Sequence, residues 1–183
     1  AVRGRTVTRA GRKGKAFWLE FDESPWLFGH LGMAGWVREL GSSSIRLREH
    51  GDAPFEDKGG KPRFLKLRLV AESGAQVVLT DLRRLARLWL GDSADTDEFI
   101  GRLGPDCYLE PATGKELERR LADRKAPIKA LLLDQRLFAG VGNWIADEVL
   151  YRARIDPRRA GGSLRPAELR RLAEALVEVI GKA

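Results

Sequence analysis

The sequence contains a single cysteine, Cys107, among its 183 residues. One cysteine cannot form an intrachain disulfide, and it cannot supply a cysteine-based zinc site. We therefore predict that the protein binds no metal and no other cofactor. The scarcity of cysteine also fits the reducing interior of a cell.

Long apolar runs are missing as well. No stretch approaches the roughly 20 apolar residues that a helix needs to cross a bilayer. No charged segment followed by an apolar one opens the chain. These absences predict a protein that has no membrane partner and is not exported. The chain begins with Ala1 in place of Met, so we expect it to be a fragment of a longer protein.

The charge balance is basic. Lys and Arg total 33 against 26 Asp and Glu, which gives a net charge of +7 at pH 7. This excess favours a polyanionic partner without identifying one. With 43% hydrophobic and 32% charged residues, the composition is that of a globular protein. The length suffices for one large domain or two small ones.

The first part of the chain has the pattern of β-strands. From Lys15 to about Val78, apolar and polar residues alternate, as at Phe17, Leu19 and Phe21. Period-two alternation with one polar face predicts an antiparallel sheet or sandwich.

The second part has the pattern of helices. Residues 41–63 are rich in Gly, Ser, Pro and charge and predict an exposed hairpin or loop, while residues 91–111 carry the turn signals of a connection. From Gly114 onward nearly everything is helical in pattern. Strands followed by helices indicate an α+β fold. We predict an antiparallel β-sandwich over residues 1–100 and a helical domain over residues 101–183.

A helix around Lys129 stops at two glycines, Gly140 and Gly142, and a new helix starts at once with Asn143. The glycines permit positive φ and leave backbone N–H groups unshielded, and Asn143 is a good N-cap whose side chain can also turn toward an anion. The segment fits either a turn that binds a DNA phosphate or an ordinary corner between helices. A third helical stripe favours a compact DNA-binding unit, and its members are Leu169, Leu172, Ala173, Leu176 and Ile180.

Three segments of the β part each have two interpretations. The charges of residues 12–15 are either solvated or part of a site. Residues 30–35 form either a sheet bend that buries Met33 or a bend from which Met33 projects as a wedge into a base stack. The paired arginines of residues 81–86 are either surface charge or fill an emptied base position and reach a phosphate.

Together these segments resemble the formamidopyrimidine-DNA glycosylase and endonuclease VIII family over nearly the whole chain. The shared motifs occur in the family's order: His-Leu-Gly-Met-x-Gly, Asp-x-Arg-Arg, Leu-Gly-Pro-Asp, Ile-Lys, and Gly-Val-Gly-Asn followed by Ala-Asp-Glu. The stretch Gly-Asn-Trp-Ile-Ala-Asp-Glu-Val-Leu-Tyr is most similar to plant-like and fungal-like members. The resemblance implies a monomer in which a helix-two-turn-helix DNA-binding domain follows the β-sandwich.

The resemblance also implies a function in base-excision repair. Family members bind double-stranded DNA that contains oxidised bases or abasic sites, flip the damaged base out, cut its glycosidic bond and cleave the strand as AP lyases. The protein would then act in the cytoplasm or nucleoid of a bacterium or in the nucleus of a eukaryote.

The resemblance assigns roles in the β part to five residues. Lys15 takes the position that contacts a phosphate near the lesion. Met33, Arg83 and Leu85 take the positions that fill the void, with Arg83 facing the orphaned base, and His30 belongs to the same DNA-binding set. Leu85 departs from the family's usual aromatic residue, which makes it a smaller wedge.

In the helical part, the resemblance assigns DNA contacts to Lys129 and Asn143, with Gly142 in the turn between them. The family's catalytic groups are an N-terminal proline and the glutamate beside it, and this sequence contains neither. A secondary amine forms the Schiff base with the sugar and a carboxylate moves protons, so Lys15 is expected only to support catalysis.

Two hypotheses stay open. The chain is either the scaffold of a DNA glycosylase/AP lyase or a non-catalytic module that binds damaged DNA. A third, an RNA-binding helical domain, is disfavoured because base-void fillers have no obvious task on A-form RNA.

Overall fold

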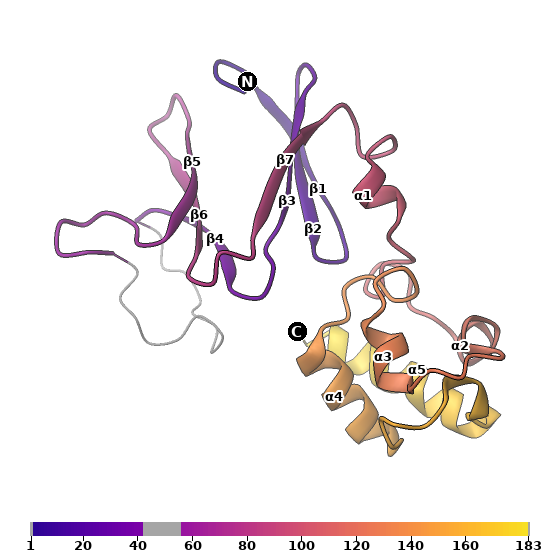
Figure 1. The fold of residues 1–183 in the computed structure, drawn as a ribbon. Coiled ribbons are helices and arrows are strands. Elements are labelled where there is room, and N and C mark those ends of the chain that lie inside the picture. Colours follow the sequence, from indigo (N-terminus) through magenta and orange to yellow (C-terminus); the bar gives the residue numbers. More distant parts are fainter. Residues whose placement is uncertain (1, 42–55, 183) are drawn as a thin grey trace. The chain divides into compact units, whose positions relative to one another are not determined.

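The fold, given by a computed structural model, consists of two compact units (Figure 1). The structure describes residues 2–41 and 56–182. The first unit, called here the sheet unit, comprises Ala1–Gly11 and Ala16–Asp92. The second, called here the helical unit, comprises Arg12–Lys15 and Ser93–Ala183. The turn that joins the first two strands is therefore part of the helical unit.

Within its described residues, the sheet unit contains two sheets. The first has the strand order β1-β2-β3-β7 and the second the order β4-β6-β5. The register of four pairs, β2 with β3, β3 with β7, β4 with β6 and β5 with β6, is antiparallel. The strands are β1 (Val7–Lys13), β2 (Ala16–Phe21), β3 (Trp26–His30), β4 (Gly35–Glu39), β5 (Leu65–Val70), β6 (Gln76–Asp81) and β7 (Arg87–Gly91).

Aromatic stacking forms the interior of the first sheet. Phe28 is fully buried, and its ring lies 5.7 Å from that of Trp89 and 6.2 Å from that of Trp18. The alternation in β2 predicted one polar face, but Trp18 is more buried than Phe17 on the opposite face. The reason is that a ring covers each face: the Trp18 ring lies against Gly11, and the Phe17 ring lies against Gly29.

Two strands lie outside the predicted strand region. β1 precedes Lys15 and is mostly exposed, so its residues show little apolar alternation. β7 follows the paired arginines and pairs with β3. Of the loop predicted over residues 41–63, residues 42–55 lie outside the described part, and the rest includes a turn closed by a bridge between Glu56 and Pro62.

In the part of the chain described, the helical unit contains five helices and one short 3₁₀ turn, and the last four of these helices contribute residues to one apolar core. The helices are α1 (Glu98–Gly101), α2 (Gly114–Leu121), α3 (Ile128–Leu133), α4 (Asn143–Ala153) and α5 (Pro166–Ile180), with η2 (Gly161–Ser163) before α5. The apolar stripe predicted for the third helix is buried from Leu169 to Leu176, while Ile180 packs at the edge of the core.

The predicted connection over residues 91–111 has more structure than expected. Asp97 caps α1, since its Oδ1 accepts a hydrogen bond from the Ile100 N–H at 2.9 Å. Farther along, Asp106 pairs with Ala139 in an isolated bridge, and the Cys107 N–H donates to the Ala139 carbonyl. The second half of this segment therefore packs into the helical unit.

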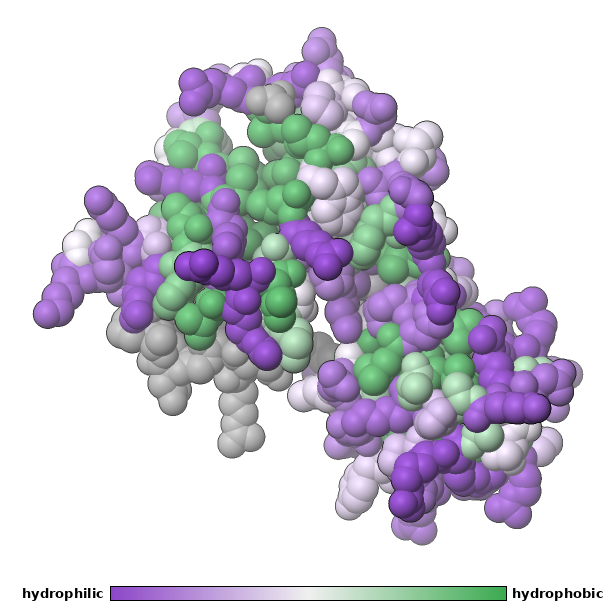
Figure 2. All heavy atoms as spheres, viewed as in Figure 1, coloured by the Kyte–Doolittle hydropathy of each residue, from purple (hydrophilic) through white to green (hydrophobic). Residues whose placement is uncertain are grey.

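The two units differ in how apolar and hydrophilic residues are distributed. Figure 2 shows apolar residues gathered in the centre of the sheet unit, whereas hydrophilic residues cover most of the visible face of the helical unit. No helix within residues 2–41 and 56–182 has both the length and the apolar character to cross a membrane. The domain ranges 1–100 and 101–183 stay a prediction.

Candidate nucleic-acid interface

The turn over residues 140–143 ends the segment that follows α3 and leads into α4. Gly140 has a φ of +101°, in the left-handed region that favours glycine. Gly142 caps α4 with a φ of −110°, and its carbonyl accepts from the Ala146 N–H at 2.8 Å. The prediction that Asn143 is the N-cap is therefore wrong.

Asn143 is instead the first residue of α4, and it is exposed. The difference arises because Gly142 already has the extended backbone of a cap, which places Asn143 in the first helical turn. No side chain caps α4. The N–H groups of its first turn are left available to an anion, and the helix dipole favours negative charge there.

Gln135 holds the 140–143 turn in shape. Its Oε1 accepts from the Gly140 N–H at 3.0 Å, while its Nε2 donates to the carbonyls of Leu133 at 3.0 Å and Val141 at 2.8 Å. The sequence had predicted no role for Gln135. A side-chain amide can both donate and accept hydrogen bonds. The position of an amide two residues beyond a helix was the only local signal that Gln135 could hold the turn.

Lys15 meets the same turn. Its Nζ donates to the Val141 carbonyl at 3.1 Å. A Cβ built on Gly142 would lie 3.1 Å from that Nζ, so the lack of a side chain at 142 leaves room for the ammonium. Lys15 is half-buried, and burial lowers its pKa below the ordinary value. The helical unit thus places a cation beside the start of α4.

Lys129 approaches α4 from α3. Its Nζ lies 2.6 Å from Oδ1 of Asp147, and Asp147 follows Asn143 by four residues, on the same face of α4. Of the predicted site residues, Lys15, Lys129, Gly142 and Asn143 are therefore brought together within the helical unit.

The other predicted residues lie in the sheet unit, with His30 at the end of β3 and the rest on two loops. Asp81 is buried and holds residues 82–86: its Oδ1 accepts from the Arg83 N–H at 3.0 Å and its Oδ2 from the Ala86 N–H at 2.6 Å. The loop turns back through Arg84, which has a φ of +58°. Arg83 and Leu85 are both exposed.

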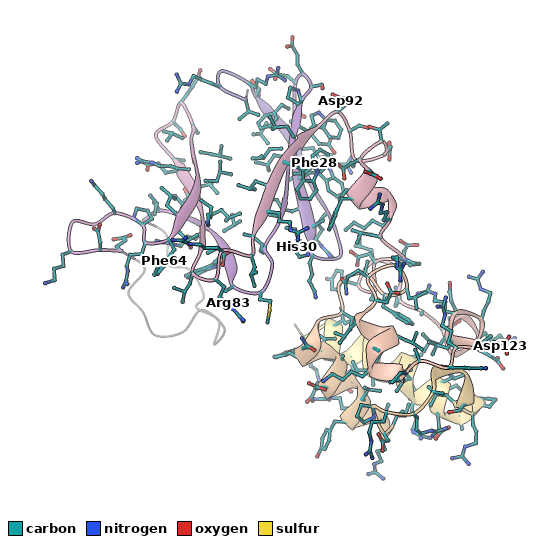
Figure 3. The ribbon with its side chains drawn as sticks, in the orientation of Figure 1. Phe28, His30, Phe64, Arg83, Asp92 and Asp123 are labelled. Carbon is teal, nitrogen blue, oxygen red and sulfur yellow. The ribbon has the colours of Figure 1, made fainter. Side chains whose placement is uncertain are left out.

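The loop that carries Met33 packs against the loop of Leu85. Gly32 has a φ of +64°, and a Cβ built on it would lie only 2.7 Å from the Leu85 carbonyl oxygen. The Gly32 N–H donates to Nδ1 of His30 at 3.0 Å. His30 and Arg83 lie toward the same end of the sheet unit (Figure 3). Met33 is 58% exposed, so the interpretation that the bend buries it is wrong.

The described residues contain no group of three or more His, Cys, Asp or Glu side chains placed to hold a metal ion. Cys107 is buried, and burial raises its pKa to about 12. It is therefore a protonated thiol at neutral pH and a poor metal ligand. The absence of a cofactor stays a prediction.

Comparisons with known proteins identify the family of the chain. Residues 1–88 match the formamidopyrimidine-DNA glycosylase N-terminal domain, and residues 103–183 match the formamidopyrimidine-DNA glycosylase H2TH domain. A formamidopyrimidine-DNA glycosylase of Arabidopsis thaliana is 38% identical over 183 residues, which are 100% of this chain and 46% of the relative. One from Halorhodospira halophila is 37% identical over 98% of this chain and 62% of its own length.

Solved structures show the same likeness. The MutM (Fpg) protein of Thermus thermophilus superposes with a TM-score of 0.78 at 36% identity, over 98% of this chain and 60% of that one. Lactococcus lactis formamidopyrimidine-DNA glycosylase, non-covalently bound to DNA that contains an abasic site, gives a TM-score of 0.78 at 25% identity, over 98% and 64%.

The fold is an α+β fold in which antiparallel sheets precede a helix-two-turn-helix domain. The chain belongs to the formamidopyrimidine-DNA glycosylase family. It spans 46% and 62% of the lengths of the two curated relatives described above. The narrower assignment to a plant-like or fungal-like branch stays a prediction.

Proposed function

We propose that the chain is the DNA-recognition scaffold of a DNA glycosylase/AP lyase in base-excision repair. Its partner is double-stranded DNA that contains oxidised bases or abasic sites, and it acts as a monomer without a metal. The observation that carries this proposal is the 140–143 turn, where Lys15 and Lys129 lie beside the start of α4, which no side chain caps. The Lactococcus lactis relative, bound to abasic-site DNA, supports it by similarity.

On this proposal the helical unit binds phosphates. Backbone N–H groups at a helix start and two ammonium groups hold an anion without reading the base sequence. Such contacts fix the register of the protein on the duplex. Gln135 and Lys15 both donate to the Val141 carbonyl, which holds the turn in this conformation without a contribution from DNA.

The sheet unit fills the gap that a flipped base leaves. Extruding a base costs about a few kcal/mol of stacking and pairing, least at a damaged or abasic site. An inserted apolar side chain beside an arginine offsets part of that cost. Met33, Leu85 and Arg83 are exposed on two loops that pack together, which is the arrangement that such an insertion needs.

Binding is tested with the 183-residue chain and fluorescent duplexes, by anisotropy over a series of salt concentrations. The proposal expects tighter binding to a duplex with an abasic-site analogue than to the undamaged duplex, and binding that weakens steeply with salt. Equal affinity for both duplexes would contradict damage recognition. Binding insensitive to salt would contradict the phosphate contacts.

Borohydride trapping then separates a lyase from a non-catalytic binding module. An amine that attacks C1′ of an abasic sugar expels water and forms an imine, which borohydride reduces to a stable amine. A crosslink that maps to Ala1 or Lys15 would support lyase chemistry in this chain. Tight abasic-site binding without a crosslink would support the binding module.

A further inference from the structure

We propose that Asp106 is a positioning residue that holds the turn over Arg12–Lys15, so that the Lys15 ammonium meets the 140–143 turn. This inference rests on the proposed function, because it assigns Lys15 to a DNA phosphate. It adds a residue from the Leu-Gly-Pro-Asp segment, for which the sequence predicted no role.

Asp106 is only 2% exposed, and hydrogen-bond donors approach both of its oxygens. Oδ2 accepts from the Gly14 N–H at 2.6 Å and from Nη1 of Arg12 at 3.0 Å. Oδ1 accepts from the N–H groups of Tyr108 at 2.9 Å and Leu109 at 3.0 Å. One carboxylate therefore joins the turn near the start of the chain to a segment about ninety residues later.

The site suits a carboxylate and no neutral substitute. Burial alone would raise the pKa of Asp106, but the N–H groups of Gly14, Leu109 and Tyr108 and the charge of Arg12 outweigh it and leave that pKa lowered. An ionised carboxylate offers only acceptors. An amide in its place would turn an NH₂ group toward one of these donors, and a buried donor without an acceptor is costly.

Asp106 acts on Lys15 through Gly14, the residue directly before Lys15. The N–H held by Asp106 belongs to Gly14, which has a φ of +58°. A Cβ built on Gly14 would lie 2.8 Å from the backbone nitrogen of Gly140, so the two turns touch at this point. Lys15 leaves the anchored residue and reaches the Val141 carbonyl at 3.1 Å. If the contact between Asp106 and Gly14 is lost, the Lys15 ammonium loses its fixed place beside α4.

A double-mutant cycle tests this chain of contacts. Asp106→Asn, Lys15→Gln and the double variant are compared on an abasic-site duplex by anisotropy over a salt series. Each single variant should bind several-fold more weakly, with a salt slope lower by about one. The double variant should be no worse than Lys15→Gln, because residues that act in one network do not contribute additively.

Whether Asp106→Asn weakens or strengthens DNA binding distinguishes a positioning role of Asp106 from a simple effect of its charge. Asp106→Asn removes a negative charge, which by long-range electrostatics alone would strengthen binding to DNA. Weaker binding therefore reports a misplaced Lys15. Additive losses in the double variant, or an unchanged salt slope in Asp106→Asn, would overturn the inference and leave Asp106 a purely structural group.

Gly14→Ala keeps the inference testable if Asp106→Asn does not fold. This variant leaves every charge in place but pushes the turn away from Gly140, and it should show the same loss of slope as Lys15→Gln. Asp156→Asn is the matched control, because Asp156 is an exposed carboxylate that also accepts from a backbone N–H and an arginine, both of Arg158. It should bind at least as tightly as the unchanged chain does, because it removes the same charge without moving Lys15.

The outcomes also distinguish this inference from the proposed function. If the unchanged chain shows no salt-dependent binding to the abasic duplex, the proposed function fails. If it binds and Lys15→Gln weakens binding, while folded Asp106→Asn and Gly14→Ala both bind normally, only the positioning role of Asp106 fails.

Discussion

Lys129 and Asp147 form an ion pair across α3 and α4, with Nζ 2.6 Å from Oδ1. Both side chains are partly exposed, at 33% and 59%, so the pair can open toward an anion. A phosphate that binds Lys129 must compete with this carboxylate. On the proposed function, the pair would therefore weaken the binding of a phosphate at the start of α4.

Asp147→Asn should strengthen binding to duplex DNA. Partly exposed ion pairs are worth about 0.2–1 kcal/mol, which corresponds to a gain of up to about fivefold. Glu174→Gln makes the same change of charge at an exposed position of α5 and is the control. Equal gains in the two variants, measured by anisotropy at low salt, would mean that net charge and not the release of Lys129 is responsible.

Asn143→Ala should weaken binding to damaged and undamaged duplexes alike, because a phosphate contact carries no information about the base. The loss should be about 0.5–1.5 kcal/mol, the net worth of one hydrogen bond. Since Gly142 and not Asn143 caps α4, the melting temperature should hardly change. A clear drop in melting temperature would instead indicate a structural role for Asn143.

Met33→Ala should reduce the preference for abasic over undamaged DNA without affecting stability. Met33 is 58% exposed, so its truncation opens no cavity in the core. Val70→Ala removes an apolar side chain that is 61% exposed on β5, and it should leave the preference unchanged. If Met33→Ala weakens binding to both duplexes by the same factor, the side chain is not a wedge.

Gly32→Ala tests whether the two loops of the sheet unit depend on each other. A left-handed backbone costs a non-glycine residue about 1–2 kcal/mol, and at Gly32 the new Cβ would also press on the Leu85 carbonyl at 2.7 Å. Gly74→Ala carries the same backbone cost, with a φ of +84° but open space around it. Gly32→Ala should therefore melt lower than Gly74→Ala and lose preference for abasic DNA. Identical behaviour of the two variants would show that the loops are independent.

Acid stability should depend on Glu168. The side chain of Arg159, followed by the backbone and side chain of Arg165, lowers the pKa of Glu168 from its ordinary 4.5 to about 2. A lowered carboxyl pKa contributes stability that is fully present above about pH 4.5 and is lost as the pH falls toward 2. Glu168→Gln should flatten the decline of the melting temperature across that window. Glu174→Gln, on the same helix, should leave the decline as it is.

Local sequence patterns correctly predicted that strands come first in the chain and helices follow. Period-two alternation indicated the sheets, and the apolar stripe of α5 indicated the core face of that helix, because both depend on near neighbours in sequence. The N-cap of α4 was misassigned since residue type alone does not reveal the extended backbone of Gly142. β1 was missed because an exposed strand shows little apolar alternation.

The sequence indicated several residues of the candidate site, but it did not indicate which groups they contact. The motifs named Lys15 and the glycine turn, yet nothing local indicated that the Gly14 N–H donates to a carboxylate 92 residues away. Gln135 was invisible for a similar reason, because its partners are backbone groups whose positions only the folded turn defines. The motifs therefore indicated Lys15 and the glycine turn, but not Asp106 and Gln135, whose roles depend on partners that only the folded chain brings close.

The assignment of Arg12–Lys15 to the helical unit has a consequence for dissecting the protein. A cut between residues 92 and 93 would yield a continuous helical fragment whose Asp106 keeps the N–H groups of Tyr108 and Leu109 but loses those of the turn. Such a fragment would bear a buried charge without its cation. The helical half can therefore be transplanted into another protein only together with the four residues Arg12–Lys15, which the sheet unit separates from it in the sequence.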